Sequence, residues 1–231
     1  MIQLTDSPDE FGPNVTKSNN RQNRIENRDF ASQDPEQIRL KYELAIDGIE
    51  YNIVRSEKTP YDIEKYCNLI DATVALACAS GKVGLAVQVK GGIGKFYENL
   101  NKGIYKELFN PQTECYYLYN CVRVVREIES ILQNKIKGLG KKSGKKYLLY
   151  THGNRMIEMF VLKKGFKASE LKHKDFTINE SYVSTCINRV VSLMEDFISK
   201  NYPDNFLATL FKNTTKCIEM DVYVTSQWKT L

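Results

Sequence analysis

Apolar residues recur at helical spacing through most of the chain, and this pattern predicts a mainly helical protein. The helices are separated by glycines, prolines and short polar segments. The pattern predicts helices from Asp34 to Gly48, from Thr59 to Gly81, in shorter pieces between Val83 and Asn110, from Thr113 to Lys137, from Lys146 to Lys164, from Thr177 past Ile198, and from Pro203 to Phe211.

Two helix starts carry clear signals. Asp34 suits an N-cap, Pro35 suits the first helical position, and Gln37 stands where the partner residue of a capping box is found. The segment from Thr177 to Glu180 has the same capping-box spacing. In the first of these helices, four apolar residues share one face: Ile38, Tyr42, Ala45 and Ile46.

Alternation of apolar and polar residues predicts a few short strands. The segments are 49–54 and 218–225, and Ile2 and Leu4 suit a third. The expected fold class is therefore mainly α with a few short strands near the N- and C-termini (α+β), around a body like a helical bundle. We divide the chain into an N-terminal segment, 1–58, and a helical domain, 59–231.

Composition narrows the class of protein. The 231 residues are 42% hydrophobic and 26% charged, which is typical of a globular chain with a sizeable core. No apolar run is long enough for a membrane span, and the first ten residues do not resemble a secretory signal. The six cysteines form no C-x-x-C pair, so we expect buried thiols in a reducing cytoplasm and no zinc site.

Positive charge is concentrated in one stretch. Residues 135–174 hold 12 Lys or Arg against 2 Asp or Glu, a local charge of +10, so the rest of the chain sums to −5 within a net charge of +5. The densest part, 135–146, has three glycines and no apolar periodicity. It predicts a basic loop, and its candidate phosphate-binding residues are Lys141, Lys142, Lys145 and Lys146. A solvated loop without a ligand is the alternative.

The sequence contains only incomplete versions of known catalytic motifs. Residues 90–95 lack the complete phosphate-loop pattern and predict only a bend between helices. Glu170 and Lys172 have the E-x-K spacing of some metal-dependent nucleases, without a suitably placed Asp. His152 and Arg155 are candidates for an acid–base group and an anion clamp, or for a buried histidine beside an outward arginine. We expect no cofactor and no metal.

An amide-rich segment near the N-terminus is the most unusual local feature. Side-chain amides both donate and accept hydrogen bonds, so this segment could bind a base or a phosphate, or bond its own backbone in successive turns. Its candidate binding residues are Asn19, Asn20, Arg21, Gln22 and Asn23.

These residues open a longer pattern that resembles the AIPR family, named for abortive infection phage resistance. The pattern consists of Thr16, Asn20-Arg21-Gln22-Asn23, Asp29-Phe30, Asp34-Pro35-Glu36-Gln37 and Gly48-Ile49-Glu50-Tyr51. Family members are usually longer, and the chain resembles their C-terminal portion. The resemblance implies a role in bacterial defence against phage, in a fragment or a short family member, and assigns no catalytic residue.

Three hypotheses follow. The first is a nucleic-acid-associated or regulatory module that contacts DNA or RNA through the amide-rich and basic segments. The second is a protein-interaction domain that completes a larger AIPR-type protein, which predicts an exposed apolar patch near the N-terminus. The third is a nuclease, for which no complete set of catalytic residues can be assembled.

Overall fold

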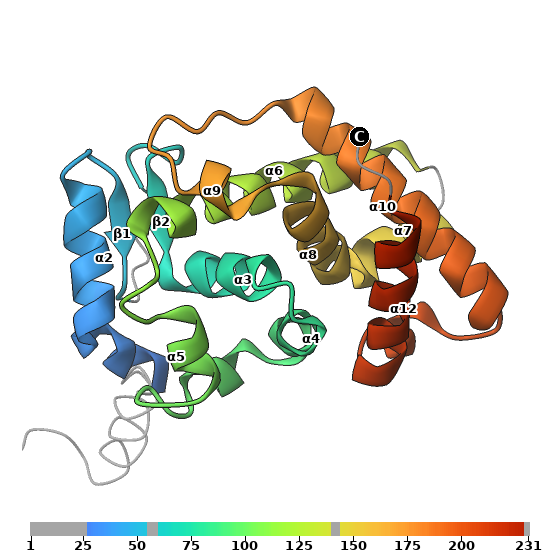
Figure 1. The fold of residues 1–231 in the computed structure, drawn as a ribbon, viewed down its shortest axis with the longest axis horizontal. Helices are drawn as coiled ribbons and strands as arrows, with labels where there is room; N and C mark the ends of the chain where they lie inside the picture. Colours follow the sequence, from blue (N-terminus) through green and yellow to red (C-terminus); the bar gives the residue numbers. More distant parts are fainter. Residues whose placement is uncertain (1–26, 55–59, 140–143, 229–231) are drawn as a thin grey trace, which may run out of the picture.

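The computed structural model describes residues 27–54, 60–139 and 144–228, and within them the chain is mainly helical (Figure 1). The only sheet among these residues has two short strands. The prediction of a mainly helical chain is confirmed. The elements in chain order are η1 (Asn27–Gln33), α2 (Pro35–Ala45), β1 (Glu50–Asn52), β2 (Tyr66–Asn68), α3 (Leu69–Ala79), α4 (Val83–Gly91), η2 (Ile93–Tyr97), α5 (Ile104–Leu108), α6 (Cys115–Gly138), α7 (Lys145–His152), α8 (Asn154–Gly165), α9 (Ala168–Leu171), α10 (Glu180–Asn201), α11 (Leu207–Leu210) and α12 (Thr214–Gln227).

Helix α3 lies at the centre and contacts α4, α6 and α8. Three of its four alanines, Ala72, Ala75 and Ala77, are fully buried, so that neighbouring helix backbones approach closely. The long amphipathic helix α6 packs along α3, and α10 packs against α6, α8 and α12. Gly81 ends the turn after α3 with a φ of +66°, a conformation that glycine adopts without strain.

At the N-terminal end, α2 covers β1, which pairs in parallel with β2. Asp34 caps α2 as predicted, because its Oδ1 accepts a hydrogen bond from the Glu36 N–H at 3.0 Å. The capping-box role of Gln37 is wrong. Its side chain is buried, accepts from the Tyr51 hydroxyl at 2.6 Å and donates to the Tyr105 hydroxyl at 3.1 Å, which ties α2 to β1 and α5.

Two predicted elements are wrong because short apolar patterns fit both a helix and a strand. The helix expected from Thr59 begins only at Leu69, because 66–68 pairs with β1 and Asn68 caps α3. The strand expected at 218–225 is part of α12, in which Cys217, Met220 and Val224 face the core at helical spacing. Helical and alternating patterns overlap over such short segments, and tertiary contacts decide between them.

The predicted helix at 146–164 is two helices that meet at Gly153. A Cβ there would stand 2.8 Å from the Phe211 ring and 2.7 Å from the Leu149 carbonyl oxygen, so only glycine fits. Helix α10 begins at Glu180, three residues after the predicted start, and the predicted capping box is wrong because Asn179 caps the helix in place of Thr177. The bend expected at 90–95 is confirmed, since α4 ends at Gly91 and η2 follows.

Candidate functional site

Helix α7 begins with two lysines, an arrangement that does not stabilise a helix. Lys145 and Lys146 are exposed in its first turn, which contains no acidic residue. The N-terminus of a helix carries a partial positive charge and favours anions, so two cations there add to a positive field that has no partner within the helix. This end of α7 is therefore suited to attract an anionic ligand.

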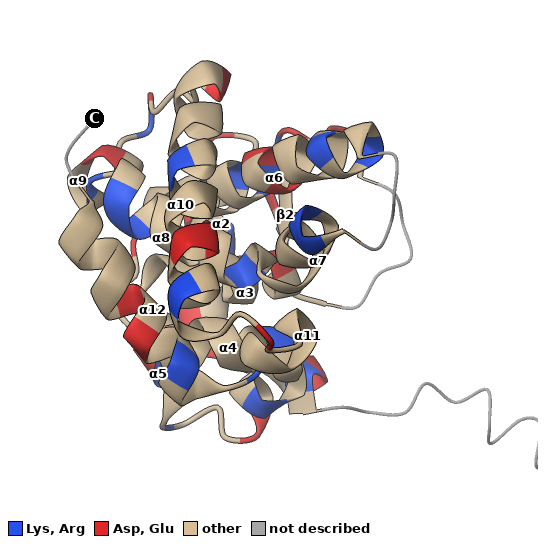
Figure 2. Cartoon of the chain, turned by 90° about the vertical axis from the view of Figure 1, so that its right-hand side faces the viewer, with Lys and Arg blue, Asp and Glu red and all other residues tan. Residues whose placement is uncertain are grey.

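The C-terminal end of α6 contributes two more cations to the same side of the molecule. Lys135 and Lys137 lie in its last turn, and α6 contacts α7. Figure 2 shows Lys and Arg positions at this end of α6 and on α7. Among the described residues, neither Lys137 nor Lys145 nor Lys146 forms an ion pair, and Lys135 donates to the Asn188 side chain at 2.8 Å. We call Lys135, Lys137, Lys145 and Lys146 the basic tip.

Farther along the basic stretch, carboxylates from other elements neutralise much of the charge. Lys163 pairs with Asp221 at 2.8 Å, and Lys172 with Glu114 at 2.6 Å. Lys174 pairs with Asp47. The folded molecule therefore concentrates unpaired positive charge at the basic tip more sharply than the sequence alone indicates.

A second group of cations lies at the other end of α7. Lys90 of α4 donates to the Thr151 carbonyl oxygen at 2.8 Å and to Asn154 Oδ1 at 2.7 Å. His152 is half-buried, and its pKa is lowered by burial and by the positive charges of Lys90 and Lys212. Burial and the nearby Arg155 and Lys212 likewise lower the pKa of Lys90. Positive charges thus occupy both ends of α7.

Arg155 does not act as a free anion clamp. Its guanidinium donates to Glu129 Oε1 at 2.8 Å and to Glu158 Oε2 at 2.7 Å. Glu158 is fully buried, and its Oε1 has no hydrogen-bond partner among the described residues. Burial, which outweighs the attraction of Arg155, raises the pKa of Glu158 to about 7. Arg155 therefore serves the core, and neither predicted description of it as exposed is correct.

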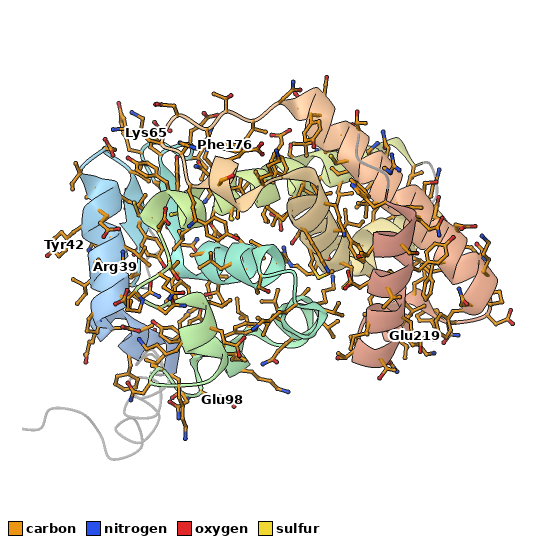
Figure 3. The ribbon with its side chains drawn as sticks, in the orientation of Figure 1. Arg39, Tyr42, Lys65, Glu98, Phe176 and Glu219 are labelled. Atoms are coloured by element: carbon orange, nitrogen blue, oxygen red, sulfur yellow. The ribbon has the colours of Figure 1, made fainter. Side chains whose placement is uncertain are left out.

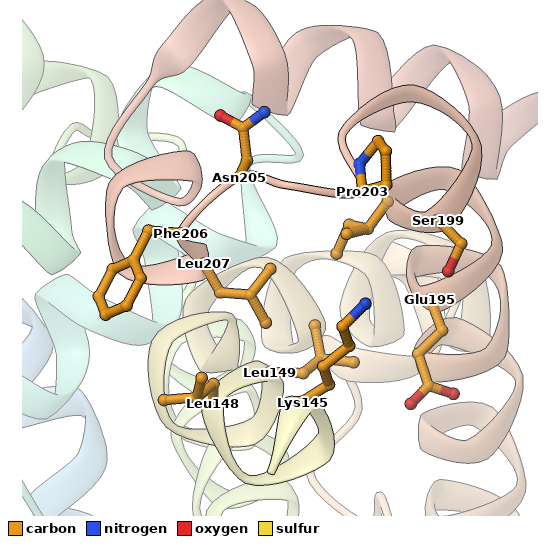
Figure 4. Close-up of a pocket in the computed structure, with 10 residues that line it drawn as sticks. Lys145, Leu148, Leu149, Glu195, Ser199, Pro203, Asn205, Phe206 and Leu207 are labelled. Atoms are coloured by element: carbon orange, nitrogen blue, oxygen red, sulfur yellow. The ribbon is translucent and has the colours of Figure 1, made fainter. Parts of the chain in front are cut away.

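A cavity of about 400 Å³ lies beside α7, between this helix, the C-terminal end of α10 and α11 (Figure 4). Its walls are mostly apolar, and Lys145, Glu195 and Ser199 bring polar groups to its lining. Phe206, which also lines it, is 68% exposed. The basic tip and the cavity share Lys145, so they adjoin each other.

The structure describes only some of the predicted site residues and brings only some of these together. Asn19, Asn20, Arg21, Gln22 and Asn23 lie outside the described residues, as do Lys141 and Lys142. Of the rest, Lys145, Lys146 and His152 all belong to α7. The two lysines form part of the basic tip at its N-terminal end, and His152 lies near Lys90 and Lys212 at the other end.

Several residues of this region were not predicted from the sequence. Lys90 and Lys212 come from distant segments, and only the fold brings them to His152. Glu158 stands in an apolar helical pattern, and a charged residue on such a face is a usable signal of a buried pair. Phe206 gave no signal in the sequence.

The E-x-K tripeptide has a structural role. Glu170 accepts a hydrogen bond from the Lys167 N–H at 3.1 Å and thereby caps α9, while Lys172 pairs with Glu114. In the part of the chain that the structure describes, no group of three or more His, Cys, Asp or Glu could hold a metal ion.

The cysteines are free thiols, and burial raises the pKa of those at the core, such as Cys67 and Cys217, to about 12. Such thiols are poor nucleophiles at neutral pH. None of the described helices combines the length and the apolar character that a bilayer crossing demands. Comparison of the chain with family models, with curated proteins and with solved structures finds no match.

Proposed function

We propose that this chain is a nucleic-acid-associated module of a phage-defence system. The observation that carries the nucleic-acid part is the positive charge without an ion pair at the basic tip, while Lys163, Lys172 and Lys174 of the same basic stretch are paired with carboxylates. The phage-defence part rests on the AIPR-like pattern from Thr16 to Tyr51. Phosphate backbones are the polyanions for which such a surface is suited, because binding releases their condensed counterions.

Fluorescence anisotropy with labelled DNA and RNA oligonucleotides tests this function. We expect binding that weakens steeply as salt rises from about 50 to 200 mM. Charge reversal by Lys145→Glu with Lys146→Glu should lower affinity for every sequence, because phosphate contacts do not distinguish bases. The matched control is Lys41→Glu with Lys102→Glu, which makes the same charge change at exposed positions in α2 and before α5.

Equal loss of binding in both double variants would show a response to net charge alone and would contradict a site on α7. Absence of salt-dependent binding by the unaltered chain would contradict the nucleic-acid proposal altogether. For the defence role, bacteria that express the chain should yield fewer phage plaques than bacteria that express the α7 double variant. Equal plaque numbers would count against it.

A protein-interaction domain is the second candidate, and an exposed apolar face favours it. Tyr42 of α2 is 68% exposed, Ile46 at its C-cap is 82% exposed, and Ile38 lies one turn before Tyr42 on the same face. The opposite face carries the buried Leu40 and Leu44, so apolar residues occupy both sides of the helix. Figure 3 shows Tyr42 pointing away from the body of the protein.

The hypothesis of a protein-interaction domain predicts an exposed apolar patch near the N-terminus, and this face of α2 fits that description. The partner that the hypothesis implies is the N-terminal half of a longer AIPR-type protein. Co-expression of the chain with that half as a separate polypeptide tests it. Tyr42→Glu with Ile46→Glu should abolish co-elution in size-exclusion chromatography. Ile218→Glu with Val222→Glu, at exposed apolar positions on α12, should preserve it. If both double variants co-elute with the partner, the α2 face is not the interface.

A further inference from the structure

The cavity beside α7 combines features that match one unpaired nucleobase. About 400 Å³ of space is bounded by apolar side chains, which suit the faces of a flat ring. Figure 4 shows Leu148 and Leu149 of α7 on one side and Leu207 of α11 across from them. The walls bring α7 together with α10, α11 and the loop between them, which are far from α7 in sequence, so the cavity is a product of the fold.

Polar groups at the edge of this cavity have unused hydrogen-bonding capacity. Within the described part of the chain, the Glu195 carboxylate and the Ser199 hydroxyl make no hydrogen bond or ion pair with another side chain. Both lie one turn apart on α10 and line the cavity. A carboxylate accepts from the amino and imino groups of a base edge, and a hydroxyl both donates and accepts. A purely aliphatic ligand would leave both groups without partners.

An exposed aromatic ring and a cation also line the cavity. Phe206 lines the cavity and is 68% exposed, so its ring is accessible to a ligand in the cavity. Aromatic side chains of this kind stack on bases in proteins that bind single strands. Lys145 lines the same cavity and belongs to the basic tip, so it stands where the phosphate of a bound nucleotide can be reached.

From these observations we propose that the cavity between α7, α10 and α11 holds one unstacked base of a single-stranded nucleic acid. Phe206 stacks on the base, Glu195 and Ser199 contact its edge, and Lys145 binds its phosphate. This inference rests on the proposed nucleic-acid function and specifies its substrate as single-stranded. A base paired in a duplex is not free to enter such a cavity.

The test compares a single strand that contains one 2-aminopurine with the corresponding duplex. We expect fluorescence quenching of the single strand on binding and tighter binding of the single strand than of the duplex. Phe206→Ala should remove the quenching and weaken single-strand binding about 5- to 150-fold, the range for removal of one stacked aromatic ring, while duplex binding stays unchanged. Because Phe206 is largely exposed, the variant should keep the folded state, which circular dichroism verifies.

The matched control is Tyr61→Ala, which removes a fully exposed aromatic ring before β2 and should change neither affinity. If Phe206→Ala binds the single strand as tightly as the unaltered chain does, the base pocket is wrong, although binding through the basic tip stands. That result would also point to another occupant, such as an apolar side chain of a partner protein. If neither nucleic acid binds, the proposed function itself fails.

Discussion

The two halves of the basic stretch, 135–146 and 155–174, differ in whether their cations form ion pairs. In 135–146, the described lysines form no ion pair with another described residue and lie at one end of the molecule, where α6 and α7 adjoin. In 155–174, Arg155, Lys163, Lys172 and Lys174 each pair with a carboxylate from another part of the chain or from the next helical turn. The local sequence charge is thus a poor measure of the local field, because carboxylates pair with four of the six cations in the second half and with none of the described lysines in the first.

The contrast also separates two uses of a cation. Arg155 compensates the buried carboxylate of Glu158, and its removal would leave that carboxylate buried without a partner and destabilise the fold. Lys145 and Lys146 compensate nothing in the described protein, and their removal should leave the fold intact. Stability measurements and binding measurements should therefore respond to different members of the same stretch.

The largest effect is expected from Arg155→Met. It leaves the fully buried Glu158 without its main partner, and we expect a loss of about 3 kcal/mol in the free energy of unfolding. Urea denaturation measures this, with Lys146→Met as a control that should change it by less than about 0.5 kcal/mol. Adding Glu158→Leu to Arg155→Met should restore much of the stability, since no buried charge then remains. A loss equal to that of the control would show that the pair contributes nothing.

Next in size is Gly153→Ala, at the corner where α7 and α8 meet. The new methyl group would collide with the Phe211 ring and the Leu149 carbonyl oxygen, and we expect a loss of about 1–3 kcal/mol. Gly84→Ala in α4 is the matched control, because a Cβ there meets nothing within 4 Å and alanine favours the helix. Thermal unfolding should show a lower midpoint for the first variant only, and equal midpoints would contradict the tight corner.

A smaller effect concerns the salt dependence of binding. Lys145→Gln with Lys146→Gln should reduce the slope of log K against log salt by up to about 2, close to one for each phosphate that a lysine no longer neutralises. Lys172→Gln with Lys174→Gln removes cations that are paired with Glu114 and Asp47, and should leave the slope nearly unchanged. Similar slopes for the two double variants would remove the distinction between the halves.

A separate effect is a pH dependence that arises from Glu158. Its pKa is raised in the folded protein to about 7 from an ordinary 4.5, so the folded state binds more protons than the unfolded state between these values. Stability contributed by the protonated group is therefore full below about pH 4.5 and is lost as the pH rises through about 7. Glu158→Gln should flatten this part of the profile of unfolding midpoint against pH. An unchanged slope would assign the dependence to other groups.

Prediction from sequence succeeded where one signal dominated. The long amphipathic pattern of α6 and the Asp34-Pro35 start of α2 gave helices at the expected places. It failed at 66–68, where pairing with β1 prevailed over helical spacing, and at 218–225, where alternation of only eight residues fitted a helix equally well. The face of α2 was identified correctly as apolar, but Ile38, Tyr42 and Ile46 point outward while Leu40 and Leu44 face the core.

The candidate site was predictable only in its lysines. Charge density along the chain indicates Lys145 and Lys146, because consecutive residues need no fold to lie together. It cannot indicate that Asp221, Glu114 and Asp47 neutralise the later lysines, or that Lys90 and Lys212 approach His152. The cavity is likewise invisible in the sequence, since its walls join segments around residues 148, 198 and 206.

By itself, the sequence determined the helical character of the chain, the ends of a few helices such as α6 and the start of α2, and the position of the densest positive charge, because these depend on neighbours within a few residues. Only the tertiary structure decided which cations remain unpaired, why Gly153 must be glycine, and where Phe206 and Glu195 share a cavity. These properties depend on distances between segments that are far apart along the chain. Such distances are fixed when the helices pack to bury their apolar faces.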